Sequence, residues 1–272
     1  MKHSKKEIKE REEKIIEYLR SHPNADIDEI ATVFSISSST IRRDINRLKE
    51  EGKIKDRWAG LVAKHTDSLL DLSEIEEHSM NNPQERDAIA KRVVFLLEPN
   101  DIVFVNTSAT ALRMYSYLPG IPLTVITNNA MAVTRKLGPN IQLILTGGEV
   151  RTNQQNSGKV AMIGGYAIET LNRVNANKCI LGVSGISSEN GISTASVQDI
   201  PINQAILDHT HGKVIVVADH TKIGVSQTFV YAPLSRIDIL VTDSKSDPEE
   251  LERIRKSGVE VIVVDKEDEF RE

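Results

Sequence analysis

The chain is poor in cysteine and contains no long apolar run. A single cysteine, Cys179, stands among 272 residues, so no disulfide framework can form within the chain. It lies in the apolar stretch CILGV, which predicts a small buried core residue rather than a nucleophile. No apolar run approaches the ~18–20 residues that span a bilayer, and the start, MKHSKKEIKEREEK, lacks the apolar core of a secretory signal. We therefore expect a cytoplasmic protein without membrane contact, and we expect no cofactor.

The charge is divided unevenly along the chain. The formal net charge is −5, with 39% hydrophobic and 27% charged residues, as in soluble globular proteins. Residues 1–64 carry 15 basic and 12 acidic side chains, whereas the remainder carries 19 and 27. A mildly basic small module joined to an acidic larger one fits a nucleic-acid-binding head on a body that binds something else.

Three helical patterns and a hairpin pattern fill the first 62 residues. Apolar residues recur at helical intervals in residues 5–20 and 27–34, and again from residue 38 onward, where Gly52 can end the helix. The following stretch, KIKDRWAGLVA, alternates loosely between apolar and polar residues, as in a β-hairpin. Together these elements predict a winged helix-turn-helix, which reads DNA with the N-terminal residues of its second motif helix.

The predicted recognition helix begins with hydroxyl residues and two arginines. Hydroxyls and backbone N–H groups at a helix start suit phosphate oxygens, and arginine can bind guanine or phosphate. A salt-bridged surface helix is the alternative, and the neighbouring helix, turn and hairpin favour DNA. The candidate DNA-binding residues are Ser38, Ser39, Thr40, Arg42, Arg43, Asn46 and Arg57. Trp58, the only tryptophan, is expected to pack the hairpin onto the helices.

The same segment resembles a known family. Arg11, Ile15 and Leu19, followed by Ser37-x-x-Thr40-Ile41-Arg42-Arg43-Asp44-Ile45, are similar to the signature of DeoR-family bacterial transcriptional regulators. The hairpin DRWAG resembles the family's Arg-x-Gly-Gly wing, with Ala59 in place of the first glycine. The resemblance covers nearly the whole chain. It implies a repressor that binds operator DNA as a homodimer or homotetramer.

The body of the chain predicts an α/β domain. Seven short β-rich runs (IVFV, LTVIT, IQLIL, CILGV, VIVVA, IDILV and VEVIVV) recur after residue 101, and many are separated by helical stretches. This texture predicts a mostly parallel, Rossmann-like sheet covered on both faces. The resemblance implies the fold shared by ribose-phosphate isomerases and CoA transferases. We expect a DNA-binding domain at 1–62, a linker at 63–83 and a ligand-sensing domain at 84–272.

The loops that follow these strands are the expected ligand site, because ligands bind at the carboxyl ends of parallel strands. Hydroxyl-rich and glycine-rich loops can hold an anion, and Lys222 supplies a point charge for a phosphate or carboxylate. The resemblance implies that the ligand is a phosphorylated sugar or a related anionic metabolite. The candidate ligand-binding residues are Asn106, Thr107, Ser108, Thr110, Thr127, Asn128, Gly147, Gly148, Gly185, Asp219 and Lys222.

Two departures from the family pattern concern this site. The family's first loop usually reads Asp-x-Gly-x-Thr, whereas Asn106 and Ser108 stand at the acid and the glycine. Family members often carry a Glu and a basic residue on the helix before the VIVVA strand, and Asp199 and Gln204 are the corresponding places. These changes predict altered selectivity for the ligand.

Two other classes of function remain as alternatives. An isomerase on this fold needs a carboxylate base beside a substrate-binding lysine, and a CoA transferase needs a nucleophilic glutamate; neither is evident in the glycine-rich loops. A metal site at Asp208-His209-Thr210-His211 is disfavoured, because two histidines two positions apart do not share a helix face. We therefore expect neither an enzyme nor a metal site, while His220 could touch the ligand.

Overall fold

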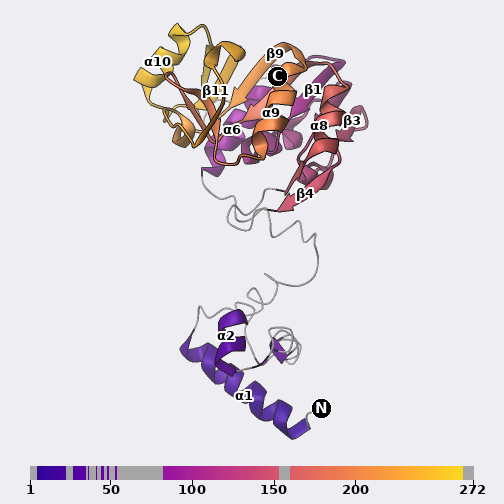
Figure 1. Cartoon of the computed structure of the whole chain (residues 1–272), viewed down its shortest axis with the longest axis vertical. Coiled ribbons are helices and arrows are strands. Elements are labelled where there is room, and N and C mark those ends of the chain that lie inside the picture. Colours follow the sequence, from indigo (N-terminus) through magenta and orange to yellow (C-terminus); the bar gives the residue numbers. More distant parts are fainter. Residues whose placement is uncertain are drawn as a thin grey trace. The chain divides into compact units, whose positions relative to one another are not determined.

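The chain divides into two compact units, Met1–Leu70 and Asp71–Glu272. The computed structural model describes residues 5–22, 27–34, 36, 41, 44, 45, 48, 53, 82–152 and 160–265 (Figure 1). The linker and domain limits predicted at 63 and 83 fall on or beside residues outside these ranges, so they stay a prediction.

The first unit contains the helices predicted at its start. The described helices are α1 (Lys5–Ser21) and α2 (Ile27–Phe34), and the described positions 41, 44, 45 and 48 are also helical. One apolar cluster joins all three segments: Ile15, Leu19, Ile30, Ala31, Ile41, Ile45 and Leu48. The buried positions recur at the three- and four-residue intervals of a single helix face, which confirms the predicted core of this unit.

The second unit is built on a seven-stranded sheet in the order β12-β11-β9-β6-β1-β2-β3, with every neighbouring pair parallel. Each of the seven β-rich runs forms one of these strands, which confirms the predicted fold class. Their bounds are β1 (Asp101–Val105), β2 (Leu123–Thr127), β3 (Ile141–Leu145), β6 (Ala176–Gly182), β9 (Thr210–Val217), β11 (Ile239–Asp243) and β12 (Glu260–Val264).

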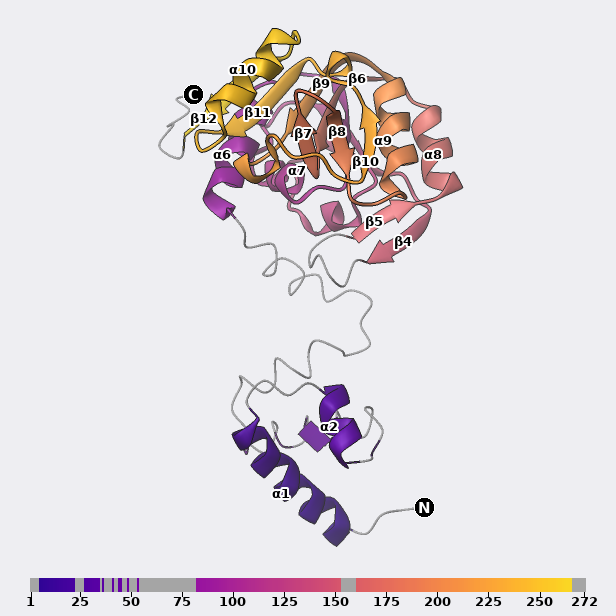
Figure 2. The same cartoon turned by 60° about the vertical axis from the view of Figure 1, so that its left-hand side comes forward.

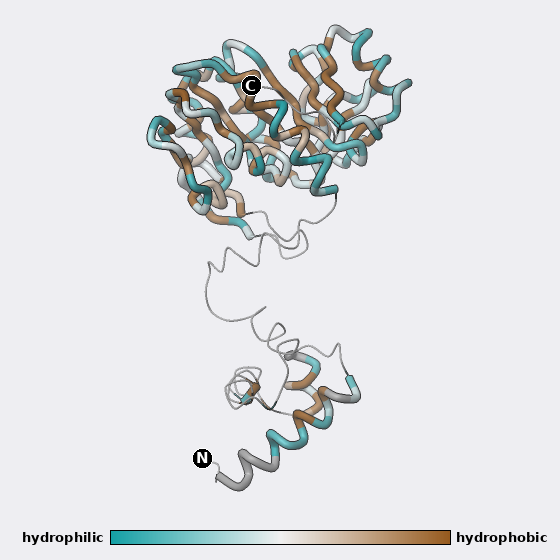
Figure 3. The backbone as a smooth tube through the Cα atoms, turned by 180° about the vertical axis from the view of Figure 1, so that it is seen from behind, coloured by the Kyte–Doolittle hydropathy of each residue, from teal (hydrophilic) through white to brown (hydrophobic). Residues whose placement is uncertain are grey.

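Helices cover both faces of this sheet. Alternate residues of a strand point to opposite faces, so Val103 and Val105 pack under α6 (Pro83–Val94), whereas Phe104 joins the core on the other face. That other face carries α8 (Gly165–Asn172), α9 (Asp199–Asp208) and α10 (Pro248–Lys256), and α8 and α9 lie side by side in Figure 2. Figure 3 shows that the strands between these layers are the most hydrophobic part of the unit.

Two small antiparallel sheets accompany the large one. One contains β4 (Glu149–Thr152) and β5 (Val160–Ile163), and the other has the order β10-β8-β7, with β7 (Gly185–Ser187), β8 (Gly191–Thr194) and β10 (Phe229–Ala232). Short connecting helices complete the described elements: α7 (Ala109–Arg113), η1 (Met114–Tyr117), η2 (Ala130–Thr134), η3 (His220–Lys222) and η4 (Leu234–Arg236). The strands β7 and β8, between β6 and β9, were not predicted from the sequence.

The strand order places a crevice between β1 and β6. From β1, the chain first extends the sheet through β2 and β3, and it later adds β6, β9, β11 and β12 on the opposite side. Open α/β sheets bind ligands at such a switch point, outside the carboxyl ends of the strands. The residues directly after β1 and β6 are therefore the expected position of a ligand site.

Candidate functional site

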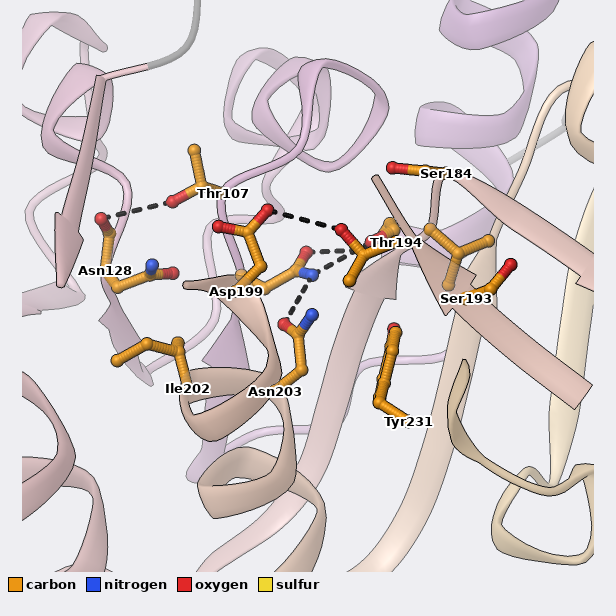
Figure 4. A pocket seen from close by; sticks show the side chains of 12 residues that line it. Thr107, Asn128, Ser184, Ser193, Thr194, Asp199, Ile202, Asn203 and Tyr231 are labelled. Atoms are coloured by element: carbon orange, nitrogen blue, oxygen red, sulfur yellow. Dashed lines mark hydrogen bonds between the residues drawn. The ribbon is translucent and has the colours of Figure 1, made fainter. Parts of the chain in front are cut away.

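A pocket lies at this switch point (Figure 4). It is bordered by the ends of β1, β2 and β6, by α9, and by β8 and β10 of the small sheet. Its lining residues are Asn106, Thr107, Asn128, Gly182, Val183, Ser184, Ser193, Thr194, Asp199, Ile202, Asn203 and Tyr231. Three of the predicted ligand residues, Asn106, Thr107 and Asn128, are among them.

Asn106 holds the two central strands together at the base of the pocket. Its side-chain amide donates to Gly182 O at 2.9 Å and to Asn203 Oδ1 at 3.0 Å, and its Oδ1 accepts from Gly182 N at 2.9 Å. A carboxylate at this position could not donate to the Gly182 carbonyl, so asparagine suits this arrangement where the family's pattern has an acid. Asn106 thus lines the pocket with its polar groups already engaged in the scaffold.

The two positions singled out on α9 have different surroundings. Asp199 lines the pocket, whereas the Gln204 side chain is exposed, and the neighbouring Asn203 is buried and faces the pocket. Successive helical residues are rotated by about 100°, so neighbouring positions of α9 face different ways. The residue of α9 that bonds to Asn106 is Asn203, and the correspondence of Gln204 to the family's basic residue stays a prediction.

Arg151, which sequence reasoning missed, forms an ion pair with Asp199. Its Nη2 lies 2.5 Å from Asp199 Oδ1, and its Nη1 donates to Ser196 Oγ at 2.6 Å and to Gln198 Oε1 at 3.0 Å. Arg151 comes from β4, far from α9 in the chain, and the sequence gives no local sign of this pairing. The arginine fixes the start of α9 and the carboxylate at the edge of the pocket.

Two buried side chains of the lining keep polar atoms without a hydrogen-bond partner among the described residues. Asn128 donates from Nδ2 to Met162 O at 3.2 Å, but its Oδ1 has no partner, and the hydroxyl of Tyr231 has none either. Burial, with added contributions from Cys179 and Asp199, raises the pKa of Tyr231 far above its ordinary value, so this side chain keeps its proton. Tyr231 was not predicted from the sequence.

Ser108, Thr110 and Thr127 were predicted to bind ligand and do not line the pocket. Ser108 caps α7, accepting from Ala111 N at 3.3 Å, and Thr110 is buried in the first turn of that five-residue helix. Thr127 donates to Val105 O at 2.6 Å and accepts from Asn129 N at 3.0 Å, which ties the end of β2 to β1. Among these hydroxyls of the first loops, only Thr107 lines the pocket, and it donates to Asn128 O at 3.2 Å.

The predicted glycines lie outside the lining as well, and backbone packing explains two of them. A Cβ on Gly148, whose φ is 107°, would lie 2.4 Å from Ile163 O, and a Cβ on Gly185 would lie 2.4 Å from Val225 O. Gly147 has a φ of 69°, in the left-handed region that favours glycine. The close approach of protein backbone is thus sufficient reason for glycine at 148 and 185.

Asp219 and Lys222 also lie at the carboxyl edge of the sheet, in the turn after β9. Burial favours the neutral acid, but a hydrogen bond from Thr221 and the charges of Arg86 and Lys222 together hold the pKa of Asp219 below its usual value. Arg86 Nε lies 2.9 Å from Asp219 Oδ2. The backbone N–H of Lys222 donates to Asp219 O at 2.9 Å, while its half-buried side chain makes no hydrogen bond or ion pair within the described part of the chain.

The other residues noted in the sequence have structural partners or lie outside the described ranges. His220 Nδ1 lies 2.9 Å from Asp243 Oδ1, while His209 and His211 bond to Ala205 O and Asn175 Oδ1. Burial raises the pKa of the Cys179 thiol to about 12, which agrees with the predicted core role. All the predicted DNA contacts, and Trp58, lie outside the described residues. No helix among the described residues is long and apolar enough to cross a membrane.

Two family models match the chain. Residues 11–66 match the DeoR-like helix-turn-helix domain, and residues 81–244 match the DeoR C terminal sensor domain. The two matches define a transcriptional regulator that joins a DNA-binding domain to a sensor domain. The chain belongs to the DeoR family, which confirms the resemblance seen in its sequence.

Relatives match over almost their whole length. The HTH-type transcriptional regulator GolR of Listeria innocua is 29% identical over 258 residues, which cover 94% of this chain and 98% of that protein. The putative aga operon transcriptional repressor of Escherichia coli O157:H7 is 27% identical over 258 residues, covering 94% and 93%.

Among solved structures, the full-length sorbitol operon regulator SorC from Klebsiella pneumoniae has a TM-score of 0.40 and 13% identity, covering 88% of this chain and 97% of that one. Ribose 5-phosphate isomerase A from Methanocaldococcus jannaschii has a TM-score of 0.37 and 13% identity, covering 52% and 55%. Both similarities are low, and the strand order of the chain itself defines the fold.

Proposed function

We propose that this regulator represses a carbohydrate-metabolism operon and responds to a phosphorylated sugar or similar anionic metabolite in its second domain. The observation that carries the proposal is one chain with a helix-turn-helix domain, a sensor domain and a pocket at the switch point of the sensor sheet. Two relatives, named as a putative aga operon repressor and as the repressor GlcR of Bacillus subtilis, support repression rather than activation. We place the DNA-binding domain at 1–62, the linker at 63–83 and the sensor at 84–272.

The proposed partners are double-stranded operator DNA and a second copy of the chain. Helix-turn-helix proteins commonly bind paired half-sites, which mirror the two-fold symmetry of a dimer. We therefore propose a homodimer or a homotetramer. Sedimentation of the full-length protein with and without a DNA duplex from its own upstream region would test this.

An enzymatic function finds little support in the pocket. Among the described residues that line the pocket, Asp199 is the only acidic one, it is paired with Arg151, and none is a lysine or a glutamate. Isomerisation would need a base beside a substrate-binding lysine, and acyl transfer to CoA would need a nucleophilic glutamate. Turnover of sugar phosphates, measured beside a gel shift on the upstream DNA, separates the two classes.

Arg42 and Arg43 are proposed to contact DNA. Replacing either by alanine should weaken operator binding by ~1–3 kcal/mol if it contacts a base, and loss of sequence preference would identify such a contact. A phosphate contact would instead give a shallower dependence of affinity on salt. Lys14→Ala removes the same charge from an exposed position on α1 and serves as the control. Wild-type binding by both arginine variants would contradict the assignment.

Lys222 is proposed to hold the anionic end of the effector. Removing it as Lys222→Ala should cost ~1.5–3 kcal/mol of ligand binding, the usual worth of a hydrogen bond to a charged group. Operator affinity without ligand should stay unchanged, while the ligand's effect on operator binding fades. Calorimetric titration with a panel of sugar phosphates measures this, and Lys136→Ala, which removes an exposed lysine of the same unit, is the matched control. Equal ligand affinity in Lys222→Ala and wild type would place the anion elsewhere.

A further inference from the structure

Among the described residues, the lining of the pocket at the switch point offers no cation to a ligand. The only charged residue of that described lining is Asp199, a carboxylate, and no described lysine or arginine belongs to it. The nearby Arg151 has its guanidinium directed at three acceptors of residues 196–199, among them Asp199 itself. An anionic group placed in this pocket would meet a carboxylate and find no lining cation to offset it.

The polar groups that remain available in the pocket are neutral donors and acceptors. Asn128 Oδ1 accepts, and the Tyr231 hydroxyl can donate or accept; these two residues are only 3% and 7% exposed and the two atoms have no partner among the described residues. Asn203 uses its Oδ1 to accept from Asn106, which leaves its amide N–H groups for the pocket. Figure 4 shows Asp199, Asn203 and Tyr231 bordering one space.

A ligand hydroxyl matches such a set, because each hydroxyl donates one hydrogen bond and accepts others. A buried acceptor or hydroxyl without a hydrogen-bond partner is unfavourable, so a ligand that hydrogen-bonds to Asn128 Oδ1 and to the Tyr231 hydroxyl would bind favourably. An anionic group gains nothing comparable here, because Asp199 is a carboxylate. The chemistry of the lining thus selects a hydroxylated and locally uncharged compound.

We propose that this pocket binds the uncharged, hydroxyl-bearing part of a sugar or polyol, with Asn128, Asn203 and Tyr231 as the residues that determine specificity. The inference rests on the proposed function, since it concerns the effector of the same domain. It adds that the phosphate of such an effector lies outside the lined pocket, on the side of Lys222, which is not a lining residue. Selectivity between effectors then comes from their hydroxyl pattern.

The first test removes one hydroxyl from the pocket. Tyr231→Phe should not lower the melting temperature of the free protein, because the hydroxyl has no partner among the described residues. It should weaken the best binder from a panel of hexoses and hexitols, each supplied also as its monophosphate, by about tenfold. Inorganic phosphate, titrated alone, should bind wild type and variant equally. Tyr115→Phe removes a buried hydroxyl from a tyrosine that does not line the pocket and should leave every affinity unchanged.

The second test adds a negative charge to the pocket. Asn203→Asp keeps an oxygen that can accept from Asn106 and replaces the free amide by an anionic oxygen. Loss of the Asn203 amide donor should weaken the binding of a hexose or hexitol by about tenfold, and the monophosphate of the same compound should lose the same factor, because its phosphate lies outside the pocket. A phosphate inside the pocket would be repelled by the new carboxylate, so the monophosphate would lose roughly a further tenfold or more.

The two tests distinguish a wrong pocket assignment from a wrong effector class. Equal binding by wild type and Tyr231→Phe, or a loss in Asn203→Asp that is about tenfold greater for the monophosphate than for its uncharged parent compound, overturns the inference, while a ligand that still changes operator binding leaves the proposed function standing. If no compound of the panel binds the wild-type protein, the proposed effector class falls and the inference falls with it.

Discussion

Replacing Arg11 by methionine is expected to destabilise the helix-turn-helix unit by about 3–5 kcal/mol, the usual result of removing one partner of a buried ion pair. Arg11 Nε lies 2.6 Å from Asp44 Oδ2, and the two side chains are only 15% and 3% exposed. Asp44 follows Arg43 directly, and its helix packs on α1 through Ile41 and Ile45. Without the guanidinium, the buried carboxylate of Asp44 would lose this charged partner beside that core.

A loss of this size approaches the whole stability of a small domain. Operator binding should therefore disappear in Arg11→Met, and the thermal unfolding of this unit should occur at a lower temperature. The transition of the sensor unit should stay where it is in wild type. Circular dichroism melts and gel shifts on the full-length protein would measure both effects.

Two further variants show whether charge burial is the cause. Lys14→Met removes an exposed cation from the same helix and should melt like wild type. Adding Asp44→Leu to Arg11→Met removes both charges, and replacing a buried pair by apolar side chains is often neutral or stabilising, so much of the lost stability should return. A single Arg11→Met variant that melts at the wild-type temperature would refute the argument.

The large sheet and the helix-turn-helix core could be predicted because their signals are local. Each of the seven strands contains a short apolar run, central strands such as β1, β2 and β11 are largely buried, and the buried residues of the helices recur at helical spacing. The small sheet of β7, β8 and β10 escaped prediction. Its strands are three or four residues long, and β7 follows glycine-rich sequence that also suits a loop.

The pocket could be located from the sequence, but most of its contacts could not. Strand ends of a parallel sheet share one edge, so Asn106, Thr107 and Asn128, which lie after strands in loops that resemble the family's pocket, were predicted and do line it. Tyr231 and Arg151 come from short antiparallel strands, and their positions depend on pairings between distant segments. Nothing local distinguishes such residues from any other strand residue.

Ser108 shows how one residue can have two explanations. In the sequence, Ser108 suggested a ligand contact, because it lies after a strand and before a helix, where hydroxyls and backbone N–H groups can hold an anion. In the structure it caps α7 and occupies the space beside Gly182, where a Cβ would lie 1.8 Å from Ser108 Oγ and 2.2 Å from Ser108 Cβ. A serine at 108 and a glycine at 182 are therefore a matched pair at the base of the pocket.

This pairing predicts that Gly182→Ala destabilises the sensor unit by about 1–3 kcal/mol or more, as overpacking of a tight site does. Gly182 also exchanges two backbone hydrogen bonds with the Asn106 side chain, so a shift of this strand end would disturb the pocket. Ligand affinity should fall together with stability. Urea unfolding of the full-length protein, followed by the sensor transition, would give the free energy of unfolding.

Ser108→Gly provides the compensating change. Alone it should cost only a few tenths of a kcal/mol, because glycine is a tolerable substitute at a helix N-cap. Combined with Gly182→Ala it removes both close contacts and leaves Ser108 Cα, at 3.6 Å, as the nearest atom of that residue, so the double variant should be nearly as stable as Ser108→Gly. A coupling energy of about 1–3 kcal/mol would result. Gly120→Ala, whose Cβ meets no atom within 4 Å, is the matched control, and a double variant as unstable as Gly182→Ala would show that Ser108 is not what requires the glycine.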